Sequence, residues 1–289
     1  MGKGSKIYTA YLLISYIIFG TIGLFVKFIP LPSAVIAAFR GICGALFIYI
    51  YMLITKKRIE SREIKSNALV LAFSGLAIGF NWIFLFEAYR YTSIATATLC
   101  YYMAPVFVMI AAPFVLKEKI RLKNIVCIII AVIGMVLVSG ASFGDKRELL
   151  GVLLGLAAAT LYAFVIICNK KMGEIASETR ALSQLLIAGV TVLPYTLLTV
   201  KANELSADKT GILFLIIIGI VHTGFAYVLN LGTVAKVPAG TVAVLSYIDP
   251  VVAIILEAVV LTTLPSLSVI CGAVLILGAT AAASLEKRE

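Results

Sequence analysis

The stretch Thr92–Leu116 reads TSIATATLCYYMAPVFVMIAAPFVL, and the stretch Pro238–Leu261 reads PAGTVAVLSYIDPVVAIILEAVVL. The first contains no charged residue, and the second contains only Asp249 and Glu257. A helix needs about 20 consecutive apolar residues to cross a bilayer. Each stretch is therefore long and apolar enough to be a membrane-spanning helix.

The two stretches align with each other when Pro105 is placed over Pro250. The further matches, which are weak one by one but fall in order, are Ala95-Thr96-Ala97 with Gly240-Thr241-Val242, Tyr102 with Tyr247, and Ala104-Pro105-Val106 with Asp249-Pro250-Val251. A similar offset places Gly134 over Gly278. Matches in order at nearly the same offset predict that the chain contains a duplicated unit.

Apolar runs of the same kind recur along the whole chain. It is 62% hydrophobic and 13% charged, whereas soluble domains have about 45–50% apolar and about 25% charged residues. We predict an all-α integral membrane protein with ten transmembrane helices. The predicted spans are Ile7–Val26, Leu31–Ile54, Asn67–Phe86, Thr92–Leu116, Asn124–Phe143, Leu149–Asn169, Ala181–Val200, Gly211–Leu231, Pro238–Leu261 and Ser266–Leu285.

The net charge of +10 is explained by the orientation of these spans rather than by a nucleic-acid partner. Most Lys and Arg residues, such as Lys56, Lys57 and Arg58, lie in both termini and in the loops after the even-numbered spans. Fewer, such as Arg90 and Lys146, lie in the other loops. Because cytoplasmic loops are rich in Lys and Arg, we expect a multi-pass plasma-membrane protein with both termini in the cytoplasm.

The duplication divides the chain into residues 1–144 and 145–289, with five spans in each unit. An odd number of spans makes the second unit enter the membrane from the opposite side. Inverted repeats of this kind are typical of secondary transporters, whose substrate site lies near the midplane between the halves. A static bundle produced by gene duplication is the alternative.

The run AYRYTSIATATLCYYMAP at Ala88–Pro105 resembles the ten-helix, EamA-like members of the drug/metabolite transporter superfamily. The segments Pro238–Pro250 and Gly272–Gly278 carry the same resemblance in the second unit. It covers nearly the whole chain and implies transport of small metabolites, with export of amino acids or related metabolites as the expected activity.

Ionisable residues within the spans are few, and each is costly in a bilayer unless it faces a cavity or a partner. Arg40 cannot lose its charge at ordinary pH. It could hold a substrate carboxylate, or it could pair with Glu87 or bind helix carbonyls. His222, the only histidine, could relay protons or make an interhelical hydrogen bond.

Asp249 directly precedes Pro250, which cannot donate a backbone hydrogen bond and so frees the carbonyl of Ser246. Pro105 does the same for Tyr101. Broken helices at the midplane are where transporters place their sites. Asp249 could couple transport to protons, bind a cationic group, or only bond to the kinked backbone. Glu257 lies eight residues further along the helix and could line the same path, or it could pair with a loop residue near the outer end.

An aromatic and amide set completes the candidate substrate site. Trp82 aligns with Tyr227, as Tyr102 does with Tyr247, so these pairs would meet if the halves face each other. Aromatic faces attract cationic groups, although core packing is the other explanation. The candidate substrate-binding residues are Arg40, Asn81, Trp82, Tyr101, Tyr102, Tyr227 and Tyr247.

We therefore predict a secondary transporter that works by alternating access, as a monomer or homodimer in the lipid bilayer, with proton coupling left open. No HExxH, GxSxG or GxxxxGK[ST] motif is present, so neither an enzyme nor an ATP-driven pump is expected, and neither is a metal or cofactor. The alternatives are uptake or exchange of a quaternary amine or nucleotide-derived solute, and a lipid-handling or scaffold protein.

Overall fold

The computed structural model describes residues 3–117, 122–140, 144–234, 236–237 and 239–284. The predicted span limits Phe143, Pro238 and Leu285 lie outside these residues. Within the described ranges, every regular element is a helix. The helices are α1 (Lys3–Lys27), α2 (Ser33–Ile54), α3 (Ser61–Ser66), α4 (Ala68–Tyr91), α5 (Ile94–Tyr101), α6 (Ala104–Val115), α7 (Leu122–Gly140), α8 (Lys146–Lys171), α9 (Ser177–Thr199), the 3-10 turn η1 (Ala202–Glu204), α10 (Lys209–Ile217), the π-helix η2 (Ile218–Phe225), α11 (Ala226–Val234), α12 (Ala239–Ser246), α13 (Ile248–Val260) and α14 (Leu267–Ser284).

Eight helical segments among the described residues are long and apolar enough to cross a membrane. They are Ile7–Lys27, Ser33–Ile54, Ala68–Tyr91, Ile94–Val115, Leu122–Ser139, Lys146–Lys171, Ser177–Thr199 and Lys209–Thr233. The ninth predicted span is divided into α12 and α13, and the tenth contains a shorter apolar helix, Leu267–Ala283. The chain is thus an all-helical, multi-pass membrane protein.

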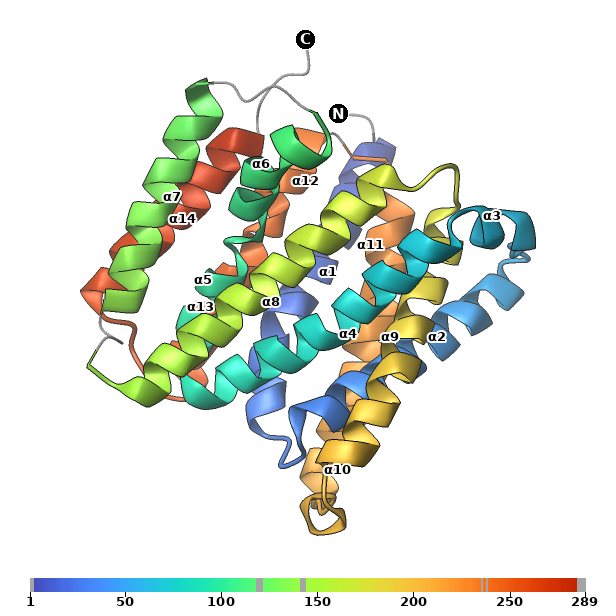
Figure 1. The fold of residues 1–289 in the computed structure, drawn as a ribbon, viewed down its shortest axis with the longest axis horizontal. Coiled ribbons are helices and arrows are strands. Elements are labelled where there is room, and N and C mark those ends of the chain that lie inside the picture. Colours follow the sequence, from blue (N-terminus) through green and yellow to red (C-terminus); the bar gives the residue numbers. More distant parts are fainter. Residues whose placement is uncertain (1–2, 118–121, 141–143, 235, 238, 285–289) are drawn as a thin grey trace.

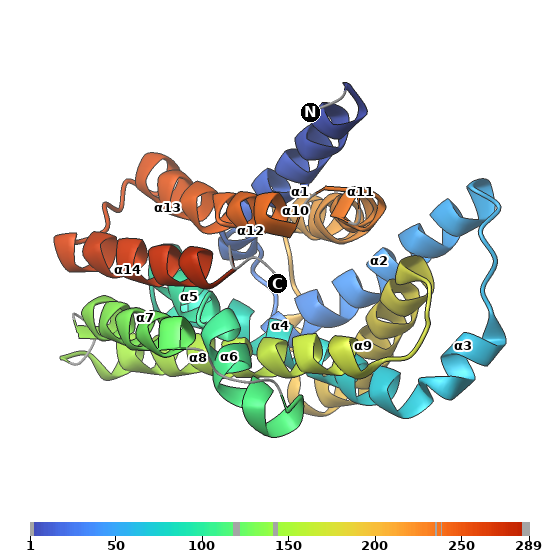
Figure 2. The same ribbon diagram turned by 90° about the horizontal axis from the view of Figure 1, so that it is seen from above.

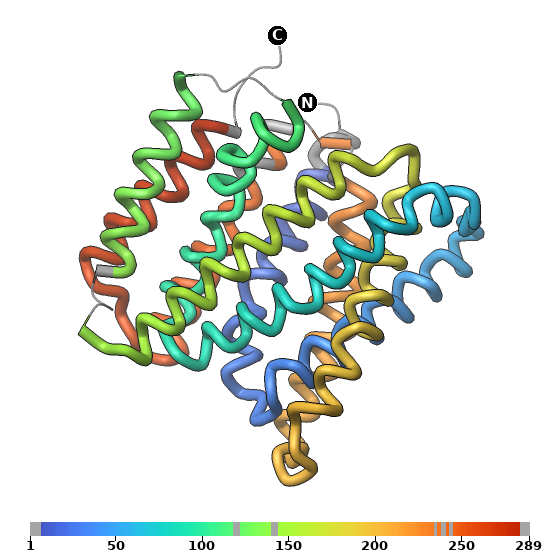
Figure 3. The backbone as a smooth tube through the Cα atoms, in the orientation of Figure 1, coloured from blue at the N-terminus to red at the C-terminus, as the bar shows by residue number. Residues whose placement is uncertain are grey.

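The helices of the two sequence halves interleave (Figure 1). At one edge α7 lies beside α14, while α2 packs on α9 and α4 packs on both α8 and α9. The turned view in Figure 2 keeps α14 beside α7, and places α1, α11 and α13 in one layer and α4, α8 and α9 in another. In Figure 3 the early, blue-to-green segments therefore run next to late, yellow-to-red ones.

Contacts between the two sequence halves come in matching pairs: a contact of one helix with the other half has a counterpart in which the roles of the halves are exchanged. The third span of the first half, α4, packs on α8, the first span of the second half; correspondingly, α11 packs on α1. In the same way α9 packs on α4 while η2 packs on α2, and α13 packs on α1 while α5 and α6 pack on α8. In these pairs, each helix of one half thus contacts the same helices in the other half as its counterpart does.

The start of α1 and the end of α14 lie at the same end of the bundle, the upper one in Figure 1. We call this the terminal end and the opposite one the far end. The α8–α9 connection also lies at the terminal end, whereas the α1–α2 and α4–α5 connections lie at the far end.

Helices that occupy matching places in the two halves cross at glycines. A Cβ on Gly41 of α2 would lie 2.7 Å from the Cα of Gly189 in α9. A Cβ on Gly134 of α7 would lie 2.8 Å from the carbonyl oxygen of Gly272 in α14. Small residues allow this close approach of membrane helices.

Gly41→Ala should therefore lower the free energy of unfolding by about 1–3 kcal/mol, because the added methyl group meets backbone that cannot rotate away. Thermal unfolding of purified protein in detergent measures the loss. Gly232→Ala in α11 is the matched control, since a Cβ there has nothing within 4 Å among the described residues. An equal loss in both variants would contradict close packing at the Gly41–Gly189 crossing.

Both helix breaks lie just before the two aligned prolines. α5 ends at Tyr101 and α6 begins at Ala104, so Pro105 falls in the first turn of α6. α12 ends at Ser246 and α13 begins at Ile248, which places Pro250 in its first turn. Proline is tolerated in a first turn, where its missing N–H has no intrahelical partner.

Candidate substrate cavity

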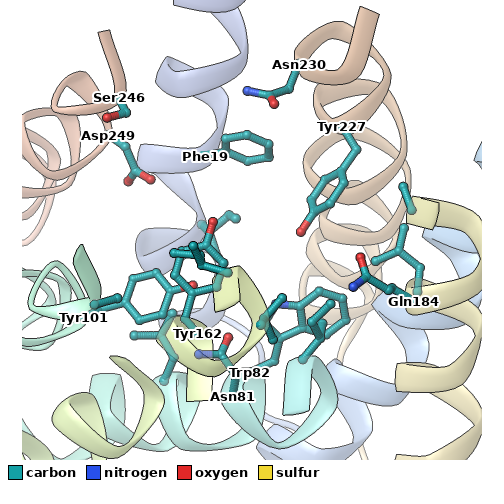
Figure 4. Close-up of a pocket in the computed structure, with 18 of the residues that line it drawn as sticks. Phe19, Asn81, Trp82, Tyr101, Tyr162, Gln184, Tyr227, Asn230, Ser246 and Asp249 are labelled. Atoms are coloured by element: carbon teal, nitrogen blue, oxygen red, sulfur yellow. The ribbon is translucent and has the colours of Figure 1, made fainter. Parts of the chain in front are cut away.

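A cavity of about 480 Å³ lies between the two halves. Its walls come from α1, α2, α4, α5, α6, α8, α9, α11, α12 and α13, and Figure 4 shows part of its lining. The residues singled out from the sequence that line it are Arg40, Asn81, Trp82, Tyr101, Tyr102, Pro105, Tyr227 and Asp249. The residues Tyr247, Pro250, His222 and Glu257 are not part of its lining.

Arg40 is the most deeply buried charged group of the cavity wall, at 3% exposure. Its Nε donates to Thr223 Oγ1 at 3.0 Å, and its guanidinium carbon lies 4.0 Å from the centre of the Trp82 ring and 5.4 Å from that of Phe86. The pairing with Glu87 considered from the sequence is not formed. Glu87 instead faces Arg90 one turn away, with 3.8 Å between Oε1 and Nε.

The guanidinium of Arg40 consequently has no carboxylate within ion-pair distance among the described residues. Nor do its two terminal nitrogens donate to an acceptor within the described part of the chain. A buried charge of this kind is costly until an opposite charge compensates it. The flat guanidinium presents paired donors that match a carboxylate or phosphate, so the site is suited to an anionic group on a ligand.

Thr223 lies in the π-helix η2, which no sequence pattern predicted. Its hydroxyl donates to the carbonyl of Ile218 at 3.0 Å, a bond that spans five residues as the π-helix does. Short π-helical turns are frequent at functional sites. Here the π-helix presents a hydroxyl to Arg40 from the other half of the chain.

The two helix breaks are joined at the level of the cavity. Tyr102, at the end of α5, donates its hydroxyl to the carbonyl of Ser246 at 2.8 Å. This is the carbonyl that Pro250 leaves without its helical N–H. The Tyr102 ring also lies 6.2 Å from the ring of Tyr247. Asp249 follows in the wall next to Ser246, across the cavity from Tyr227 and Gln184 (Figure 4).

Tyr102→Phe should lower the free energy of unfolding by about 0.5–1.5 kcal/mol, because it leaves the Ser246 carbonyl without this donor. Tyr101→Phe is the control, since Tyr101 lines the same cavity but stacks on Tyr162 at 5.2 Å and donates no hydrogen bond within the described residues. Thermal unfolding compares the two. A larger loss for Tyr101→Phe would contradict the bridge between the breaks.

The remaining wall is mainly aromatic, with fixed amide groups. Trp82 and the stacked Tyr101 and Tyr162 form one side (Figure 4). Asn81 is held in place because its Nδ2 donates to the carbonyl of Ala158 at 2.6 Å. Phe19 meets Tyr227 edge to face at 5.6 Å. Such a wall can contact the apolar part of a solute while the charged groups bind its polar part.

Sequence reasoning missed the polar residues of α9 as cavity residues. Gln184 lines the cavity and donates to Asn169 Oδ1 and to Ser74 Oγ, both at 2.8 Å. Arg180, one turn earlier, lines the cavity at the terminal end. Arg180 follows the sixth predicted span and so belongs with the charges that orient the chain, but its spacing of four residues from Gln184 places both on one helix face.

His222 lies outside the central cavity. It is 2% exposed, its Nε2 lies 2.6 Å from Thr21 Oγ1 in α1, and its ring meets Phe25 edge to face at 5.0 Å. This arrangement matches the interhelical hydrogen bond that was one of the two readings of the sequence. His222 is not among the described residues that line the central cavity, and a role in relaying protons stays a prediction.

Glu257 lies apart from Asp249, contrary to the expectation that they line one path. It is 3% exposed and its two carboxylate oxygens accept from the backbone N–H groups of Ile94, at 2.8 Å, and Ala95, at 2.6 Å. It lines a separate cavity of about 140 Å³ with Glu148, among others. The physical reason is that the start of a helix offers unpaired N–H groups that attract a carboxylate.

Comparison with known proteins identifies the family to which this chain belongs. A model of the EamA-like transporter family matches the chain twice, over residues 6–140 and 149–285. The chain belongs to the EamA-like transporter family. Both matches together cover nearly all of this EamA-like chain, including every helix that lines the cavity.

Named relatives of this EamA-like chain are transporters. A Bacillus subtilis (strain 168) protein named "Uncharacterized transporter YxxF" is 28% identical over 268 residues, which cover 92% of this chain and 85% of the relative. "Solute carrier family 35 member G1" of Mus musculus is 26% identical, with 96% and 78% covered. A "Probable amino-acid metabolite efflux pump" of Salmonella typhimurium is 29% identical over 215 residues, with 70% and 72% covered.

The fold also matches a solved crystal structure, described as "Crystal structure of protein". The TM-score is 0.68 at 19% sequence identity, with 97% of this chain and 98% of the other covered. At this identity the match concerns the fold alone. The EamA-like arrangement of the helices is therefore shared over almost the full length of both chains.

Proposed function

We propose that this chain is a secondary transporter that exports amino acids or related carboxylate-bearing metabolites by alternating access. The observation that carries the proposal is Arg40, a buried guanidinium that lies in the wall of a cavity between the two halves and has no carboxylate partner among the described residues. A substrate carboxylate would supply the missing charge. The similarity to a probable amino-acid metabolite efflux pump supports the same substrate class.

Ten crossings, in two inverted units at 1–144 and 145–289, are part of this proposal. The interrupted pair α12–α13 and the helix α14 would supply the two crossings beyond the eight long apolar segments. The family model that matches twice, and the contacts that recur with the halves exchanged, support the duplication. The Lys and Arg residues of the loops favour a cytoplasmic terminal end in the plasma membrane.

In this orientation the described conformation faces the cytoplasm. The cavity reaches the terminal end at Asn169 and Arg180. At the far end Arg90 donates to the carbonyl of Leu31 and Arg147 donates to the carbonyl of Arg90, and these bonds would hold that end closed. A cavity that loads from the cytoplasm suits an exporter, and the far end would then have to open to release the substrate.

Asp249 is the proposed proton-handling group. It lines the cavity beside the second helix break, and an acid in such a place can take up a proton from either side as the cavity changes access. Arg40 would hold the substrate carboxylate, while Trp82, Tyr101 and Tyr227 would contact the rest of the solute. A single chain in the bilayer suffices for this cycle.

Counterflow in proteoliposomes tests the proposal. The purified chain is screened with radiolabelled amino acids, quaternary amines and nucleosides, with and without a pH gradient. We expect saturable counterflow of amino acids. Counterflow of amines or nucleosides alone would favour uptake or exchange of those solutes, and no counterflow of any solute would favour a lipid-handling or scaffold protein.

A further inference from the structure

Glu257 makes an uncommon contact at the far end of the bundle. Both of its carboxylate oxygens accept hydrogen bonds from consecutive backbone amides, those of Ile94 and Ala95 in the first turn of α5. Ser93 caps the same turn, because its hydroxyl accepts from the amide of Thr96 at 3.0 Å. The orphan N–H groups of α5 are thus satisfied in part by a side chain from another helix.

This contact joins the two halves of the chain. Glu257 belongs to α13 in the second half, whereas Ile94 and Ala95 belong to α5 in the first half. α5 also carries Tyr101 and is followed directly by Tyr102, and both residues line the central cavity. A carboxylate that holds the start of α5 therefore holds the helix that must move if the cavity is to open at the far end.

The aligned position of the first half cannot make this contact. When Pro105 is aligned with Pro250, Glu257 falls on Ala112 of α6, whose methyl group accepts no hydrogen bond. Among the described residues, this helix cap from α13 thus has no counterpart from the aligned position of α6. An asymmetric contact of this kind can favour one of two states that are equivalent in the repeated backbone.

We propose that Glu257 is a latch that keeps the far side of the transporter closed and so favours the inward-facing state. The inference rests on the proposed function, because it takes the far end as extracellular and assumes alternation between two states. Opening to the outside separates α13 from α5 and breaks both bonds to Ile94 and Ala95. The cavity of about 140 Å³ next to Glu257 gives the released carboxylate room to turn.

Sided cysteine labelling tests the latch. Thr98 lines the central cavity on α5 and is 3% exposed, so Thr98→Cys in a background without the native cysteines reports access to the cavity. A membrane-impermeant maleimide is applied to intact cells, for access from outside, and to inverted membrane vesicles, for access from the cytoplasm. Glu257→Gln keeps the shape of the side chain but loses the charge and one acceptor oxygen.

With Glu257→Gln we expect labelling from outside to rise roughly tenfold, as the loss of a charge-assisted hydrogen bond implies, and labelling from the cytoplasm to fall. Glu148→Gln is the matched control. Glu148 lines the same small cavity but forms no hydrogen bond through its side chain within the described residues. It should change neither rate by more than about twofold.

Hydrogen exchange provides a second readout on the same variants. Glu257→Gln should speed amide exchange in the peptide that contains Ile94 and Ala95, and leave peptides of α7 and α14 unchanged. Unchanged labelling from both sides would overturn the latch. A rise from both sides, with faster exchange throughout, would overturn it in favour of a purely structural cap.

Failure of the underlying orientation gives a different result. If the far end is cytoplasmic, the parent Thr98→Cys protein, with Glu257 intact, labels quickly from outside and slowly from the cytoplasm. That result overturns the latch as stated, whatever Glu257→Gln does. If the parent protein labels from the cytoplasm, the orientation is as proposed, and the Glu257→Gln and Glu148→Gln results decide whether the latch exists.

Discussion

Arg40→Gln should reduce amino-acid counterflow at least about 100-fold, because the loss of one partner of a buried charge pair costs about 2–5 kcal/mol or more. In the described state Arg40 donates one hydrogen bond, to Thr223, and has no carboxylate partner among the described residues. Its removal therefore leaves no buried opposite charge behind. We expect the free energy of unfolding without substrate to stay the same or to rise.

Two further variants make this result specific. Arg40→Lys keeps the charge but loses the planar pair of donors, so it should keep part of the transport and lose affinity for the carboxylate. Arg180→Gln removes a positive charge from the terminal end of the same cavity and should have a much smaller effect than Arg40→Gln. A strong loss of stability in Arg40→Gln with normal transport per folded molecule would assign Arg40 to the structure rather than to the substrate.

Asp249→Asn should abolish the response of transport to a pH gradient and keep counterflow within about threefold of the parent. An amide cannot take up and release a proton in this pH range, whereas it retains the shape and polarity of the carboxyl group. Uptake driven by an imposed pH gradient and counterflow without one are measured in the same proteoliposomes. Equal loss of both would assign Asp249 to a cationic group of the substrate instead.

A matched control is available for this variant as well. Glu257→Gln also removes an intramembrane carboxylate, but Glu257 lies outside the central cavity. It should keep the dependence on the pH gradient. Loss of that dependence in Glu257→Gln, with Asp249→Asn still responsive, would contradict the assignment of proton handling to Asp249.

The helical and membrane character of the chain could be predicted because it depends on local composition. A long run without charged groups, such as Thr92–Leu116, has few options other than to cross the bilayer as a helix. Proline likewise acts locally, so the breaks before Pro105 and Pro250 could be anticipated from their positions alone. The aligned residues Tyr102 and Tyr247 do lie near each other.

The partners of the polar groups could not be predicted, because they come from distant parts of the chain. Tyr102 donates to the carbonyl of Ser246, and Glu257 accepts from Ile94 and Ala95. Nothing in the local sequence says which helix end a carboxylate will meet. The spacing between Asp249 and Glu257 suggested a common path, but packing of α13 on α5 takes Glu257 to a separate cavity.

Arg180 belongs both to the loop charges that orient the chain and to the polar face of α9 that lines the cavity, where it lies one turn from Gln184. The π-helix Ile218–Phe225 could not be predicted from the sequence. Its wider turns leave the uniformly apolar pattern of a membrane helix unchanged. Both omissions lie where the two halves meet, which is where local patterns carry least information.

Competition for counterflow between amino acids and their amides tests the proposed carboxylate site at Arg40 most directly. Proteoliposomes containing the parent chain are loaded with the amino acid that gives the fastest counterflow, and unlabelled free acids and the corresponding amides compete from outside. We expect the free acids to compete and the amides not to compete, because only the carboxylate can pair with Arg40. Equal competition by acids and amides, or no saturable counterflow of any amino acid, would contradict it.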